Sequence, residues 1–338
     1  MPIRTAPPEG APATYAIALL GCSFHSDDRI TWDHVLARQV PETGRGIDYM
    51  DWGGDWHYSD KQYHDEALHR ELFESEWYTV DGLRDVLHQT PLIADQLSDH
   101  DGGEGGNNHD SYQNPGVVAC QLAMSQMVPT PSLDVPNCRF SVKLLGRVLF
   151  ISLDTRSIYR SKMHDHDGPN KTLLGAPQLS ALFTWLDLAH NRGYLAMIQS
   201  DMVWDNDDIG HKHDWWGNYS YDRDLVAAKI RGRRVIICDY DFHALRIKNV
   251  SDWGGTPIIG SAGAVANTNV RGDAADYYDQ CWPDPKDGVH SFTRHWHQVV
   301  ISDDGENITV DVTGFDPREE DPVRTRATFV INAPLVAS

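Results

Sequence analysis

The chain has 338 residues, enough for one large α/β domain or two small ones, and 41% of them are hydrophobic, which argues against wholesale disorder. Its 49 acidic and 29 basic residues give a formal net charge of −20. That charge disfavours non-specific nucleic-acid binding, which depends on neutralising phosphates with Lys and Arg, and it suits divalent cations.

The cysteines and the N-terminus bear on the compartment. Five widely spaced Cys do not form the pattern of a disulfide framework. The first twelve residues lack the apolar stretch of a signal peptide, and no segment is long and apolar enough for a membrane span. We therefore expect a protein of the cytoplasm, or of a particle assembled there.

The first part of the chain alternates strand and helix signals. Residues 15–20 form a continuous apolar run, which is typical of a buried parallel strand. Asn114 and Pro115 give a helix N-cap followed by a proline at the first helical position. The expected strands are 15–20, 46–53 and 92–97, and the expected helices are 31–38, 63–77, 80–88 and 114–127.

The rest of the chain becomes richer in strands. The apolar spacing of Leu179, Leu182 and Leu186 predicts an amphipathic helix, and Gly146 lies at the turn of an expected hairpin. The expected helices are 178–190 and 221–230, and the expected strands are 138–144, 147–153, 194–199, 234–238, 245–250, 257–261, 296–302 and 307–313. No linker stands out, so we predict one α/β (α+β) domain over 15–315, with two mixed sheets packed together and flanked by helices. A flexible arm (1–14) precedes it, and a C-terminal strand or arm (316–338) follows it.

Metal-type donors follow several of the expected strands. Because ligands bind at the carboxyl ends of strands in α/β sheets, we expect these donors to converge on one edge. Carboxylate, imidazole and amide groups that converge in this way are typical of a two-metal hydrolase. In such a site a shared carboxylate holds two cations roughly 3.5–4 Å apart, and the hydroxide between them attacks phosphorus in line. The donors are Cys22, Asp55, Tyr58, Asp99, His100, Asp101, Asn107, Asn108, Asp241 and His243.

The order of these motifs resembles the PhoD-like alkaline phosphatases, a branch of the metallophosphoesterase superfamily. The similarity runs from about residue 15 to residue 243 and rests on short segments in the family's order. These are Gly21-Cys22-Ser23, Gly54-Asp55-Trp56-His57-Tyr58-Ser59-Asp60, Ser98-Asp99-His100-Asp101 with Asn107, Leu153-Asp154-Thr155-Arg156-Ser157-Ile158-Tyr159-Arg160, Asp214-Trp215-Trp216-Gly217-Asn218-Tyr219 with Arg223, and Tyr240-Asp241-Phe242-His243.

The resemblance implies a four-layer αββα sandwich of the calcineurin-like type and hydrolysis of small-molecule phosphate mono- or diesters. It also implies a binuclear centre of Fe(III) and Ca²⁺, although other divalent metals are alternatives. Thiolate and phenolate donors suit a ferric ion, and oxygen donors suit calcium. By position, iron falls to Cys22, Asp55, Tyr58 and His243, and calcium falls to Asp55, Asp99, Asn107 and Asp241.

The same resemblance suggests catalytic groups outside the ligand set. Arg156 or Arg160 is the candidate to clamp the phosphate and neutralise charge in the transition state. His100 is the candidate acid for the leaving group, or else a residue that orients a ligand.

The chain departs from the family pattern at three points. Ser98 stands where the family has Asp, and Tyr240 stands where it has Gly, so that its ring would crowd the turn. The spacing to Asn107 is stretched by glycines, which leaves Asn108 or Asp101 as alternative ligands. These departures concern the expected calcium side.

Two further hypotheses stay open beside the general phosphatase. One is a catalytically weak or inactive module that serves as a binding or structural component of a larger particle. The other is a phosphodiesterase for nucleotides or phospholipid headgroups, in which Trp56, Trp215 and Trp216 stack on a base. The loop over 201–216 is either a lid or an ordinary loop.

Overall fold

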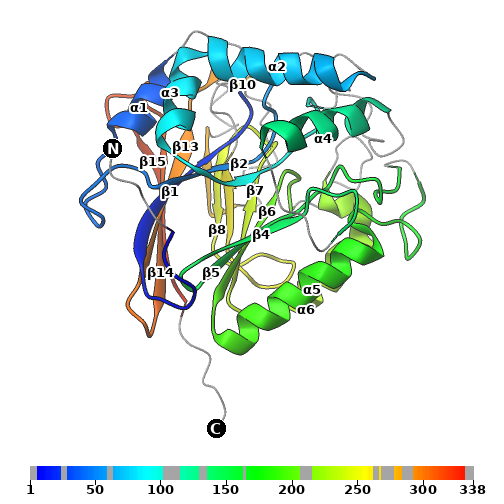
Figure 1. Cartoon of the computed structure of the whole chain (residues 1–338). Helices are drawn as coiled ribbons and strands as arrows, with labels where there is room; N and C mark the ends of the chain where they lie inside the picture. Colours follow the sequence, from blue (N-terminus) through cyan, green and yellow to red (C-terminus); the bar gives the residue numbers. More distant parts are fainter. Residues whose placement is uncertain are drawn as a thin grey trace.

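Two mixed β-sheets lie face to face between two groups of helices (Figure 1). The computed structural model describes residues 6–23, 29–58, 64–101, 115–128, 135–162, 165–205, 215–261, 266–267, 278–283 and 292–331. The fold class expected from the sequence, a four-layer αββα sandwich, is confirmed.

The first sheet joins the beginning of the chain to its end. Its strand order is β15-β14-β13-β1-β2-β3. β1 pairs in parallel with β2, and β2 with β3, whereas β13 runs antiparallel to β1 and continues the sheet through β14 and β15. The strands are β1 (Thr14–Leu20), β2 (Tyr49–Trp52), β3 (Leu92–Asp95), β13 (Trp296–Asp303), β14 (Ile308–Phe315) and β15 (Val323–Ile331).

The second sheet has the strand order β11-β8-β9-β7-β6-β5-β4. Its centre is parallel, from β5 through β6 and β7 to β9, and antiparallel strands close both sides. The strands are β4 (Ser141–Leu145), β5 (Val148–Ser152), β6 (Leu195–Ser200), β7 (Val235–Asp239), β8 (Leu245–Lys248), β9 (Ile258–Ser261) and β11 (Gln280–Trp282). β10 (Ala266–Asn267) and β12 (Phe292–Thr293) form a separate small pair.

The helices divide between the two outer faces. α1 to α4 gather on the side of β1 and β2, and α5 and α6 lie on the opposite side of the molecule against the second sheet (Figure 1). A short 3-10 turn, η2 (Trp216–Tyr219), leads into α6. The helices are α1 (Ile30–Ala37), α2 (Glu66–Thr79), α3 (Asp81–Gln89), α4 (Pro115–Met127), α5 (Gly175–Arg192) and α6 (Ser220–Ile230).

The strand sequences explain the layers. In β1, Ile17 and Leu19 enter the core between the sheets, whereas Ala18 and Leu20 pack under the helices. Both faces of the strand are therefore buried, which is why its sequence is continuously apolar instead of alternating. The second sheet repeats the pattern, because β6 sends Met197 inward and Ile198 toward α5 and α6.

The ends of the domain are tied to the sheets. Gly10 donates a backbone hydrogen bond of 2.8 Å to the carbonyl of Gly146, in the turn between β4 and β5. Part of the expected N-terminal arm is thus held in place, and residues 1–5 lie outside the described chain. The expected C-terminal strand is β15. Across the described ranges, none of the helices has the length and hydrophobicity needed to cross a membrane.

Candidate metal centre

The predicted donors lie where parallel strands of both sheets end. Cys22 follows β1, Asp55 follows β2, and Asp99 follows β3. From the second sheet, Asp241 and His243 come directly after β7. The sandwich therefore brings the carboxyl ends of the two sheets to one place, as expected for ligand sites in α/β proteins.

Three of these residues have an unusual backbone conformation. Cys22, Asp55 and Asp241 have φ angles of 57°, 53° and 67°, in the left-handed region. Residues other than glycine seldom adopt that conformation, and they keep it where the surrounding structure compensates its cost, often at functional sites. Within the described ranges, only one other non-glycine residue, Asn137, has a positive φ.

Two glycines allow the turns to approach one another. A Cβ atom on Gly53 would lie 1.8 Å from Cγ of Tyr240, and a Cβ on Gly54 would lie 2.7 Å from Cβ of Ser98. The ring of Tyr240 is fully buried and occupies the space over Gly53. The sequence suggested that Tyr240 would crowd its own turn, but the missing side chain at Gly53, in the turn after β2 of the other sheet, makes room for it.

One group of ligand-type atoms combines sulfur, oxygen and nitrogen. Ligand atoms of Cys22, Asp55 and His243 all lie within 4.8 Å of one another, and the three residues are buried. The hydroxyl of Tyr58 lies 3.0 Å from Oδ2 of Asp55 and 2.9 Å from Nε2 of His243. The four residues expected to bind iron therefore come together.

A second group shares Asp55 with the first. Ligand atoms of Asp55, Asp99 and His100 lie within 4.8 Å of one another, and Asp99 and His100 are half-buried. Asp241 belongs to the same region, since Asp99 and Asp55 add to the effect of burial in raising its pKa. Asp55 thus lies between two candidate cation positions.

The buried acidic groups at the strand ends favour the binding of a cation. Burial, and next to it the charge of Asp99, raises the pKa of Asp55 to about 6. Burial and the nearby carboxylates also raise the pKa of the Cys22 thiol and of the Tyr58 phenol well above their usual values. Oδ1 of Asp55 is buried and accepts no hydrogen bond from the described chain. Buried acidic groups that repel one another in this way are stabilised by a bound cation.

Asp101 holds the two ligand-bearing turns together. Its Oδ1 accepts hydrogen bonds from the backbone N–H of Trp56 (2.7 Å) and His57 (3.4 Å). Its Oδ2 accepts from the N–H of Asp55 and of Ser98, both at 2.9 Å. The side chain is fully buried and both of its oxygens accept from backbone amides, while the alternative in which Asp101 replaces Asn107 as a ligand stays a prediction. Its carboxylate is committed to four backbone amides.

Arg156 approaches the same carboxylates from the turn after β5. Its guanidinium is buried, and Nε donates to Oδ2 of Asp201 at 2.9 Å. Although burial alone lowers it, the pKa of Arg156 is raised by Asp201, Asp99 and Asp241. Asp201 also accepts a hydrogen bond from Thr155. Sequence reasoning missed Asp201, although its place at the end of β6 is the same signal that marked the other residues.

Arg160, the alternative phosphate clamp, has a different environment. It is fully buried, and its Nε donates to the Tyr219 hydroxyl at 2.9 Å. Its Nη1 donates to the carbonyl of Thr155 at 3.4 Å. Arg160 thus hydrogen-bonds to Tyr219 and to the turn itself, whereas Arg156 interacts with Asp99 and Asp241, so Arg156 is the better candidate.

Other residues that the sequence suggested fall elsewhere. Asn107, Asn108 and the 206–214 part of the suggested lid lie outside the described residues. Trp56 and Trp216 are fully buried and Trp215 is 5% exposed, so the idea that they stack on a nucleotide base is wrong. Trp56 instead stacks on Trp52, with ring centroids 4.3 Å apart.

Comparison with known proteins supports the fold. No family model and no curated protein matches the sequence. A solved structure of PhoD aligns with a TM-score of 0.71 and 17% identity, over 96% of this chain and 71% of that one. The purple acid phosphatase PPD1 from yellow lupin (Lupinus luteus) aligns with a TM-score of 0.60 and 11% identity, over 96% of this chain and 55% of that one. The chain therefore shares its overall fold with PhoD and with this purple acid phosphatase.

Proposed function

We propose that this protein is a metal-dependent hydrolase of small phosphate esters with a PhoD-like binuclear centre. One observation carries the proposal: the buried carboxylate of Asp55 lies between two groups of ligand-type side chains at the meeting point of the two sheets. The likeness of the fold to PhoD and to a purple acid phosphatase supports the same reaction class.

The donors differ between the two positions. A thiol, a phenol and an imidazole surround the first position, a set that suits Fe(III) once the thiol and phenol are ionised. The second is formed by carboxylates with His100 beside them, and its carboxylates suit Ca²⁺ or another divalent cation. When bound, two such cations supply Lewis-acid charge and an activated water for attack on phosphorus.

The chain's own residues complete the proposed mechanism. Arg156 offers positive charge to the phosphoryl oxygens, and Asp201 fixes the direction of its guanidinium. His100 is half-buried, and its ring centroid lies 4.1 Å from that of Tyr58, so it can deliver a proton to a leaving group on the open side. Asp101 keeps the turns of Asp55 and Asp99 in register.

The test compares hydrolysis of chromogenic phosphate monoesters and diesters by the wild type and Asp55→Asn, each reconstituted with iron and calcium. We expect the variant to lose several orders of magnitude in turnover and to retain less metal, as measured by elemental analysis. The ratio of monoester to diester hydrolysis in the wild type then identifies the substrate class. Asp224→Asn, which changes an exposed carboxylate on α6, is the matched control and should behave as the wild type.

The opposite outcome supports the second candidate function. Metal bound by the wild type without turnover of either ester would favour a non-catalytic binding module on this scaffold. The departures at Ser98 and Tyr240 motivated that hypothesis. Both residues have a place in the structure, however, because Ser98 donates to Asp99 at 3.3 Å and Tyr240 packs over Gly53.

A further inference from the structure

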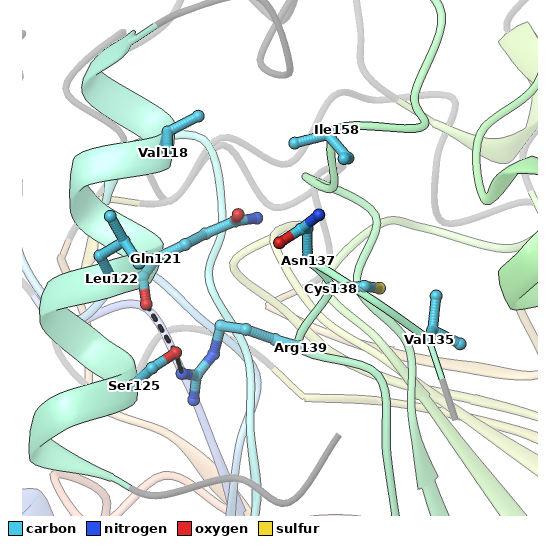
Figure 2. A pocket seen from close by; sticks show the side chains of 9 residues that line it. All are labelled: Val118, Gln121, Leu122, Ser125, Val135, Asn137, Cys138, Arg139 and Ile158. Atoms are coloured by element: carbon cyan, nitrogen blue, oxygen red, sulfur yellow. Dashed lines mark hydrogen bonds between the residues drawn. The ribbon is translucent and has the colours of Figure 1, made fainter. Parts of the chain in front are cut away.

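A separate cavity lies between α4 and the turn that carries Arg156 and Ile158. One face of α4 and the segment 135–139, which leads into β4, form its walls, and Ile158 stands above them (Figure 2). Its volume is about 380 Å³. Sites for small molecules have volumes of about 300–1,000 Å³, apolar walls and a few well-placed polar groups.

The cavity has apolar and polar parts. Val118 and Leu122 of α4 are 38% and 52% exposed, and with Ile158 they give an apolar wall that is open to solvent. The side chains of Gln121 and Asn137 extend toward each other from opposite walls (Figure 2). Among the described non-glycine residues outside the metal centre, Asn137 alone has a left-handed φ, of 52°.

Arg139 supplies the charge of the cavity. It is only 6% exposed, and its Nη1 donates to the hydroxyl of Ser125 at 2.9 Å, as Figure 2 shows. Ser125 in turn donates to the carbonyl of Gln121 at 2.7 Å, so α4 fixes the guanidinium. Although the chain has a net charge of −20, Arg139 is the single charged residue among the described residues that line the cavity. A fixed guanidinium pairs well with a planar carboxylate.

We propose that this cavity binds a small amphipathic monocarboxylate. The carboxylate pairs with Arg139, and the short apolar body lies along Leu122 and Val118. The proposal does not depend on the phosphatase function, because none of the residues involved belongs to the metal centre.

The cavity is physically linked to the metal centre. The amide Nε2 of Gln121 donates to the carbonyl of Arg156 at 3.0 Å and to Asp154 at 3.3 Å. Asp154 also accepts a hydrogen bond from the N–H of Arg139 at 2.8 Å. A ligand bound at Arg139 therefore lies next to side chains that hydrogen-bond to the turn of Arg156.

The test measures binding of 4-phenylbutyrate by isothermal titration calorimetry, with 4-phenylbutan-1-ol as the neutral probe of the same shape. We expect the acid to bind the wild type at least about tenfold more tightly than the alcohol, because the pairing with Arg139 is charge-assisted. Leu122→Trp fills the mouth of the cavity and should abolish binding. Leu225→Trp changes a similarly exposed leucine on α6 and should leave binding intact.

Further variants distinguish binding in the cavity from binding at the metal centre, which could itself bind a carboxylate. Binding should persist in Asp55→Asn, and Arg139→Met should remove the preference for the acid. If Arg139→Met does not fold, Leu122→Trp decides. Equal affinity for acid and alcohol, binding that survives Leu122→Trp, or binding that is lost in Asp55→Asn would each overturn the proposal.

Discussion

Two regions of this protein use β-strands in opposite ways. Along the antiparallel half of the first sheet, β13 and β14 pair without interruption from Trp296↔Phe315 to Asp303↔Ile308. In the other region, parallel strands end, and each is followed by a turn with a polar or thiol side chain. These strands are β1, β2, β3, β5, β6 and β7.

The two regions differ in whether the backbone N–H and C=O groups find hydrogen-bond partners within the strands. An antiparallel ladder pairs its own N–H and C=O groups along its length, so its side chains only need to pack. Parallel strands end together, and their turns need other partners, such as the Asp101 carboxylate that accepts from Asp55 and Ser98. The ladder therefore stabilises the sandwich, and the strand ends carry the polar chemistry.

Among residues of the strand-end region that are not proposed metal ligands, we expect substitution of Arg156 to have the largest effect on activity. Arg156→Lys keeps the charge but loses the planar fork, and it should lower kcat for ester hydrolysis about 10²–10³-fold without loss of metal. Steady-state kinetics with metal analysis measure both. Arg231→Lys, on the exposed surface, is the control. An unchanged kcat would remove Arg156 from the mechanism.

A smaller loss is expected for Asp101→Asn. An amide keeps the shape but cannot accept from four backbone N–H groups, so the turns of Asp55 and Ser98 should loosen. Metal affinity should fall about 10–100-fold. In the metal-free protein, amide exchange of Asp55, Trp56 and Ser98 should accelerate. Unchanged exchange at these amides would show that Asp101 does not hold the turns.

Glu76, on α2, should make the stability of the folded protein depend on pH. Burial and the charge of Asp101 raise the pKa of Glu76 to about 8. The folded protein then keeps this proton up to about pH 8, whereas the unfolded chain releases it above about pH 4.5, so stability falls as pH rises through that window. Each pKa unit corresponds to about 1.4 kcal/mol.

Glu76→Gln should therefore be more stable than the wild type at pH 8.5, by more than about 1.4 kcal/mol, and similar to it at about pH 4. Urea unfolding at the two pH values measures the difference. Glu71→Gln, an exposed substitution on the same helix, should show no such trend. A gain of equal size at both pH values would mean that ionisation is not the cause.

A substitution in the antiparallel ladder should have the smallest effect, and it should change only the stability of the fold. Ile301 of β13 is fully buried between the sheets. Ile301→Val should lower the free energy of unfolding by about 1 kcal/mol and leave kcat unchanged, because the residue only packs. Urea unfolding and ester hydrolysis on the same sample test this, and a large loss of activity would abolish the distinction between the two regions.

Local sequence patterns were enough to predict most of the strands and the positions of the donors. The apolar run at 15–20 and the acidic strand ends at Asp55, Asp99 and Asp241 are local patterns, because burial of both strand faces and polar strand ends leave a mark on neighbouring residues. The motif order also indicated the fold, which the likeness to PhoD supports.

The contacts that these donor residues make could not be predicted from local patterns. Asp101 accepts from backbone amides, Arg160 donates to the Tyr219 hydroxyl, and Tyr240 fits because Gly53 is opposite. Each outcome depends on contacts between residues that are distant in sequence. Local patterns show which groups a segment offers, whereas packing decides which of those groups remain available for a ligand.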